Sequence, residues 1–114
     1  MTITMPRGDI RVVPFTVKDA NGNLSDIAFE EVYFTVKRTY NDSEPIFQKR
    51  LTTGEIETDG TGNFWFTIEP EDTDNMGFGK YVFDIELVAL DQGIKQTATG
   101  DFVLTYEATY RANE

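Results

Sequence analysis

The chain has 114 residues, a length at which a single domain with one hydrophobic core is the usual outcome. It contains no cysteine and no histidine, which excludes disulfides, thiolate metal sites and catalysis by either residue, so we expect no enzyme, no cofactor and no metal. Acidic residues outnumber basic ones by 20 to 10, and the formal charge of −10 disfavours nucleic acid and anionic membranes as partners.

Hydrophobic residues alternate with polar ones along most of the chain, and clusters of Gly, Asn and Asp separate the alternating segments. The first clear strand is predicted from Asp9 to Lys18. Pro14 cannot donate a ladder hydrogen bond, so this strand belongs at a sheet edge or at a bulge. A turn at Asn21-Gly22 and a short extended piece at residues 24–27 lead to a half-buried strand at Glu31–Arg38.

The second half continues the same pattern. The helical potential is restricted to one short turn near residues 70–76, because Pro and acidic residues favour a helix start. Predicted strands occupy Ile46–Leu51 (a charged edge strand), residues 56–58, Asn63–Ile68, Lys80–Leu90, Ile94–Thr99 and Asp101–Tyr106. In the last of these, the inward residues are expected to be Phe102, Leu104 and Tyr106.

About seven strands with turns at short intervals predict an all-β, immunoglobulin-like antiparallel β-sandwich of Greek-key topology, with a small closed barrel as the alternative. We expect one domain over residues 1–114, with a short loose tail at residues 111–114. No apolar stretch is long enough to span a membrane, and the first residues lack the features of a secretion signal.

Two aromatic residues, Tyr33 and Trp65, are predicted to point outward from their strands. Because Trp and Tyr are enriched in protein interfaces, both are candidate interface residues. Rings on one common face would instead suit a carbohydrate-binding sandwich, which is the alternative function. One of the two rings could also simply cover a sandwich edge.

Three further motifs have plainer structural explanations. Arg7-Gly8-Asp9 matches a short integrin-binding motif, but a bend at Gly8 before the first strand explains it. The acidic segment at residues 69–75 lacks the spacing of an EF-hand, so a solvated turn is favoured and calcium binding stays open. Asp84 and Glu86 could suggest glycoside chemistry, yet alternate outward positions on one strand account for both carboxylates.

Several segments together resemble the small immunoglobulin-like domains of tailed phages and prophages, and are similar to the N-terminal domain of phage baseplate upper proteins. The most specific are the acidic Pro70-Glu71-Asp72-Thr73 turn and the strand Gly79-Lys80-Tyr81-Val82-Phe83-Asp84-Ile85. The others are Arg7-Gly8-Asp9, Pro14-Phe15-Thr16-Val17, Asn21-Gly22, Phe34-Thr35-Val36-Lys37 and Gly100-Asp101-Phe102.

The resemblance implies a non-enzymatic structural protein of a phage or prophage baseplate or tail. The protein would contact other virion proteins and would form a homo-oligomer or ring in the particle. It would be made in the bacterial host cytoplasm. The resemblance carries over five residues as fold-defining positions, without a catalytic role: Asp72, Thr73, Gly79, Tyr81 and Asp84.

Overall fold

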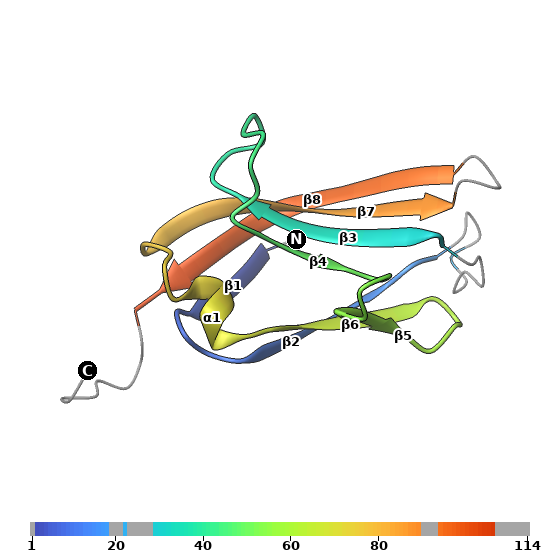
Figure 1. Cartoon of the computed structure of the whole chain (residues 1–114), viewed down its shortest axis with the longest axis horizontal. Coiled ribbons are helices and arrows are strands. Elements are labelled where there is room, and N and C mark those ends of the chain that lie inside the picture. The colour runs from blue at the N-terminus through green and yellow to red at the C-terminus, as the bar shows by residue number, and fades with distance from the viewer. Residues whose placement is uncertain (1, 19–21, 23–28, 90–93, 107–114) are drawn as a thin grey trace.

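The computed structural model describes residues 2–18, 22, 29–89 and 94–106, which form eight strands and one short helix in two layers (Figure 1). One sheet has five strands in the order β1-β8-β7-β3-β4, and the other has three in the order β2-β6-β5. The elements are β1 Thr2–Pro6, β2 Arg11–Thr16, β3 Glu31–Lys37, β4 Phe47–Arg50, β5 Ile56–Thr58, β6 Asn63–Ile68, α1 Pro70–Thr73, β7 Gly79–Ala89 and β8 Ile94–Thr105.

The core lies between the two sheets and is made by the inward residues of each strand. Burial alternates strictly along β6, and along β7 from Tyr81 onward, as expected for strands with one buried face. Phe34 of β3 meets Phe66 of β6 across the sandwich with 4.2 Å between ring centroids. Both rings are fully buried, and each such side chain stabilises the fold by about 1.5–3 kcal/mol.

The topology is that of an immunoglobulin-like sandwich, as predicted. The chain crosses between the sheets after β1, β2, β4 and β6, and the antiparallel set β4-β3-β7-β8 faces the antiparallel set β2-β6-β5. β1 completes the larger sheet by pairing with β8 in parallel. Among the described residues, no helix is long and apolar enough to cross a membrane.

β1 is a strand that sequence patterning did not identify, since the first strand was expected only from Asp9. Ile3 and Met5 are buried, and β1 pairs with Asp101–Thr105 near the other end of the chain. Two apolar residues are too few to show a periodicity, and the pairing that holds them is remote in sequence. β2 accordingly starts at Arg11, two residues later than predicted.

The last two predicted strands are one continuous strand, β8, because Gly100 pairs with Phe83 without interrupting the ladder. Tyr106 was expected to point inward and is instead 75% exposed, because the strand ends at Thr105. The predicted piece at residues 24–27 and the tail at 111–114 lie outside the described residues. Gly22, from the predicted Asn-Gly turn, is described and has a φ of 83°.

The predicted helical turn is α1, which connects the two sheets. Its N-terminus carries a capping box, in which the Glu69 backbone N–H donates to Asp72 Oδ2 over 2.8 Å. Asp72 also forms a 2.7 Å ion pair with Lys49, an inward lysine on the edge strand β4. Thr73 is fully buried, and its Oγ1 accepts a hydrogen bond from the Gly8 backbone N–H at 2.9 Å.

The bend between β1 and β2 is therefore anchored to α1. Gly8 has a φ of 84°, a left-handed conformation that favours glycine, which agrees with the plain structural explanation of the Arg7-Gly8-Asp9 motif. Arg7 Nη1 donates to the Met76 carbonyl at 3.3 Å, and the guanidinium lies 4.3 Å from the ring centroid of Phe78. These contacts leave Arg7 engaged within its own domain.

Tyr81 forms a tyrosine corner of the kind found in immunoglobulin-like domains. It lies near the start of β7, is buried, and its hydroxyl donates to the Gly77 carbonyl four residues upstream over 2.8 Å. β7 begins at Gly79, whose φ of 133° lets the chain turn from this corner into the strand. The contact fixes the connection from α1 to β7.

The substitution Tyr81→Phe removes this hydrogen bond and leaves the ring in place. We expect it to lower the free energy of unfolding by about 1 kcal/mol, measured by urea denaturation. Tyr40→Phe is the matched control, since the Tyr40 hydroxyl donates to the Gly100 carbonyl at an exposed position and should contribute less. Equal losses for both variants would contradict a structural role for the corner.

Candidate functional site

The two candidate interface aromatics lie on opposite outer faces of the sandwich. Phe34 and Phe66 point into the core, so their neighbours Tyr33 on β3 and Trp65 on β6 point away from it. Tyr33 therefore belongs to the outer face of the five-stranded sheet, and Trp65 to that of the three-stranded sheet. The two rings cannot stack on one ligand together.

Trp65 of β6 borders an apolar stripe on the three-stranded sheet, which it forms together with Val12 and Pro14 of β2. Pro14 is directly opposite Trp65 in the β2–β6 register, and Val12 is the next outward residue of β2. Val12 is 58% exposed. On the other side of Trp65, the indole N–H donates to Glu57 Oε2 of β5 at 2.9 Å, which fixes the ring.

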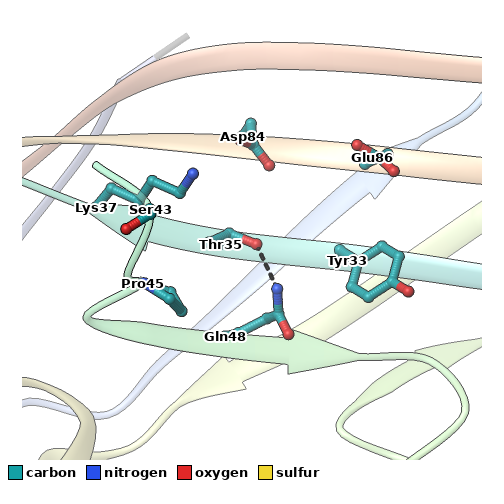
Figure 2. A pocket seen from close by; sticks show the side chains of 8 residues that line it. All are labelled: Tyr33, Thr35, Lys37, Ser43, Pro45, Gln48, Asp84 and Glu86. Carbon is teal, nitrogen blue, oxygen red and sulfur yellow. Dashed lines mark hydrogen bonds between the residues drawn. The ribbon is translucent and has the colours of Figure 1, made fainter. Parts of the chain in front are cut away.

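Tyr33 borders a polar cleft on the five-stranded sheet (Figure 2). The outward residues of three adjacent strands form its floor, and the loop before β4 forms its wall. The cleft has a volume of about 270 Å³. Its lining residues are Tyr33, Thr35 and Lys37 of β3, Gln48 of β4, Asp84 and Glu86 of β7, and Ser43 and Pro45 of the loop.

Cross-strand register assembles this cleft. Thr35 is opposite both Gln48 and Asp84, and Gln48 Nε2 donates to Thr35 Oγ1 at 2.9 Å. Burial raises the pKa of Asp84, an effect opposed by Lys37 and reinforced by the like charge of Glu86. The cleft thus holds a partly buried carboxylate that lies near both a like and an opposite charge.

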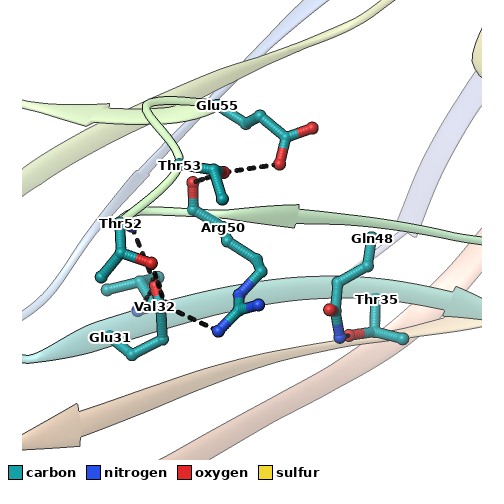
Figure 3. Close-up of polar contacts among 8 residues, drawn as sticks. All are labelled: Glu31, Val32, Thr35, Gln48, Arg50, Thr52, Thr53 and Glu55. Atoms are coloured by element: carbon teal, nitrogen blue, oxygen red, sulfur yellow. Dashed lines mark hydrogen bonds and ion pairs between the residues drawn. The ribbon is translucent and has the colours of Figure 1, made fainter.

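A polar network around the buried Glu31 lies beside the cleft, and Figure 3 shows Glu31 with its partners Val32, Arg50 and Thr52. Glu31 is 8% exposed, and its carboxylate accepts hydrogen bonds from the backbone N–H groups of Val32 and Thr52 and from the Thr52 hydroxyl. Arg50 forms a 3.2 Å ion pair with Glu31, and its guanidinium lies 5.2 Å from the Tyr33 ring centroid. Tyr33 is therefore held by a side chain that is itself fixed.

The five fold-defining positions do not form one site. Asp72 and Thr73 act in and around α1, Gly79 and Tyr81 form the corner that opens β7, and Asp84 belongs to the cleft. In the part of the chain that the structure describes, no group of three or more acidic residues could hold a metal ion. In the acidic turn, Asp72 is bound to Lys49 and to the α1 cap.

Sequence patterning missed Val12, Lys37 and Gln48 as surface residues of interest. Val12 could have been found, because alternation around Val13 places it outward beside Pro14 on an edge strand. Lys37 and Gln48 join the cleft only through strand pairing, which no local signal in the sequence shows.

No protein-family model and no curated protein sequence matches the chain. Among solved structures, it is similar to an endo-β-1,4-mannanase from Thermotoga petrophila, with a TM-score of 0.57 and 18% sequence identity. The match covers 93% of this chain and 18% of the mannanase chain, so this chain spans less than a fifth of that enzyme's length. At this identity the similarity shows a shared fold alone and establishes no activity or substrate.

Glu31→Gln should destabilise the protein in a pH-dependent way. Burial alone would raise the pKa of Glu31, but its hydrogen bonds from Thr52 and Val32 and the charge of Arg50 outweigh burial, and the pKa falls below its ordinary 4.5. The stabilisation is therefore complete above pH 4.5 and is lost as the pH falls through the folded-state pKa. We expect a loss of about 2 kcal/mol at neutral pH in urea denaturation.

Glu30→Gln, at the neighbouring exposed position, is the control and should change stability little at any pH. A loss for Glu31→Gln that is the same at pH 7 and at strongly acidic pH would show that the carboxylate charge is not the cause.

Asp84→Asn should stabilise the protein at neutral pH, whereas Glu31→Gln should destabilise it. The raised pKa means that the folded state binds the proton more tightly than the unfolded state, so this group's stabilisation is present below pH 3.8 and is lost as pH rises through the folded-state pKa. We expect Asp84→Asn to have a higher midpoint of urea unfolding than the native chain at pH 7, with the gap closing in acid. Asp9→Asn, at an exposed position, is the control. A gap that is constant with pH would refute the assignment to Asp84.

Proposed function

We propose that the chain is a non-enzymatic structural module of a tailed phage or prophage particle, in its baseplate or tail, that works through protein–protein contacts. The sequence resemblance supports the phage context, and the immunoglobulin-like fold is compatible with it. The observation that carries the contact function is the apolar stripe of Val12, Pro14 and Trp65 on an outer sheet face.

Contacts through a sheet face fit this structure better than strand addition at a sheet edge. Pro14 removes a hydrogen-bond donor from β2, an edge of the smaller sheet, and the inward Lys49 occupies β4, an edge of the larger one. Both features are recognised protections against edge-to-edge pairing. The side chains of the outer face remain as the adhesive surface.

A second copy of the chain is the partner we propose for the stripe, in a homo-oligomer or ring. Each copy carries a formal charge of −10, so two copies repel each other and the attraction must come from apolar burial. Added salt screens the repulsion and should therefore strengthen the association, the reverse of what a charge-driven interface shows.

Carbohydrate binding is the second candidate function, and the cleft beside Tyr33 is the observation that favours it. One similar solved structure is that of a mannanase, an enzyme named for a carbohydrate substrate, and this supports the candidate. A platform made jointly of Tyr33 and Trp65 is ruled out by their opposite faces, so Tyr33 would act without Trp65.

The apolar stripe can be tested with Val12→Asp, which places a charge on it. We expect the native chain to form a discrete oligomer in light scattering over a concentration series, and the variant to raise the dissociation constant at least about tenfold. Trp65 is the only tryptophan, so its emission should shift to the blue on assembly and stay unshifted in the variant.

Thr4→Asp is the matched control, because Thr4 is exposed on an edge strand of the opposite sheet and receives the same charge. A native chain that stays monomeric at all concentrations and salt levels would refute self-association. Equal weakening by both variants would show that added charge, rather than the stripe, is responsible.

A further inference from the structure

We propose that the cleft bordered by Tyr33 binds one uncharged pyranose ring of a glycan. This inference rests on the second candidate function and supplies its residues and ligand class. The cleft lies on the five-stranded sheet, whereas the apolar stripe lies on the three-stranded sheet, so the two activities can succeed or fail separately.

The size and position of the cleft suit a single small ring. Its volume of about 270 Å³ is just below the range of pockets for drug-sized ligands. Three adjacent strands of a rigid sheet supply the floor, and the segment with Ser43 and Pro45 rises on one side (Figure 2). A sugar ring of an extended glycan can enter such an open cleft from solvent.

The polar groups favour a ligand that both donates and accepts hydrogen bonds. Asp84 and Glu86 supply carboxylate acceptors, and Lys37 supplies donors on the same floor. A cation would gain from the carboxylates but would meet Lys37, while an anion would meet two negative charges. A sugar hydroxyl can donate a hydrogen bond to a carboxylate, and its oxygen can accept a hydrogen bond from the lysine ammonium group.

Asp84 is one of the two carboxylate acceptors of this set and lies opposite Thr35 on the cleft floor. Hydrogen bonds to a charged acceptor are about twice as strong as neutral ones. Gln48 is already fixed by its bond to Thr35, which leaves the amide group oriented before a ligand arrives. Little rotamer freedom remains to be lost on binding.

Tyr33 supplies the apolar wall against which the C–H groups of a pyranose can pack. In the β3–β7 register Tyr33 is opposite Glu86, so the ring and a carboxylate adjoin each other. The Arg50 guanidinium lies 5.2 Å from the Tyr33 ring centroid. Arg50 is itself paired with Glu31 (Figure 3), and it restricts the tyrosine ring from one side. An aromatic side chain held in this way offers contact area at a low entropic cost.

The test is saturation-transfer NMR on the full chain with methyl α-mannoside, methyl β-glucoside, methyl β-galactoside and the methyl glycoside of N-acetylglucosamine as probes. We expect transfer to at least one pyranoside, with amide shift changes at Tyr33, Thr35 and Asp84. Tyr33→Ala should weaken binding about tenfold, which corresponds to the loss of one aromatic packing contact. Trp65 emission should not change, because it lies on the opposite face.

Two variants keep the test interpretable. Tyr33→Phe retains the ring and should retain binding, which separates the loss of the wall from a loss of folding. Tyr106→Ala is the matched control, since Tyr106 is 75% exposed and packs on Phe78 outside the cleft. The Val12→Asp variant should bind sugar normally, so a failure of self-association leaves this result intact.

The absence of transfer to all four pyranosides would overturn the proposal. So would binding that persists in Tyr33→Ala. A parallel titration with N-acetyl-arginine methylamide covers the rival occupant, a basic side chain of a protein partner. If it shifts the cleft amides and the sugars do not, the cleft is a protein contact and the glycan proposal is wrong.

Discussion

The cross-sheet contact between Phe34 and Phe66 is the interaction on which the rest of the structure depends. Their ring centroids lie 4.2 Å apart, and neither ring retains appreciable contact with water. Because side chains alternate along a strand, fixing these two inward also fixes their neighbours outward. Tyr33 and Trp65 therefore point to opposite outer faces. The chemistry of each outer face is set by every second residue of its strands, counted from these two aromatic residues.

The two outer faces have different chemistry. The three-stranded sheet presents an apolar stripe around Trp65, whereas the five-stranded sheet presents a cleft of mixed charge around Tyr33. Two of the edge strands, β2 and β4, are poorly suited to strand pairing, because Pro14 lacks an amide donor and Lys49 places an inward charge on the edge. The proposed protein contact and the proposed glycan contact therefore lie on different faces and would not compete for surface.

Buried polar groups hold the two ends of the sandwich, and each is satisfied by partners distant in sequence. Glu31 is stabilised by Thr52 and Arg50 from the β4 side, and Thr73 receives the amide of Gly8 from the bend after β1. A buried carboxylate or hydroxyl without such partners would destabilise the fold. These contacts therefore define the connections between sheets and orient the residues next to them, Tyr33 among them.

The sequence by itself determined the strand periodicity, the single helical turn, the edge position of Pro14 and the outward orientation of Tyr33 and Trp65, because each depends on local alternation or on the covalent geometry of one residue. It could not determine that β1 pairs in parallel with β8, since that pairing joins the two ends of the chain. It likewise could not place Gln48 and Asp84 on the two sides of Thr35. Only the tertiary structure decided these points, because hydrogen-bond register between strands brings together residues whose separation along the chain carries no local signal.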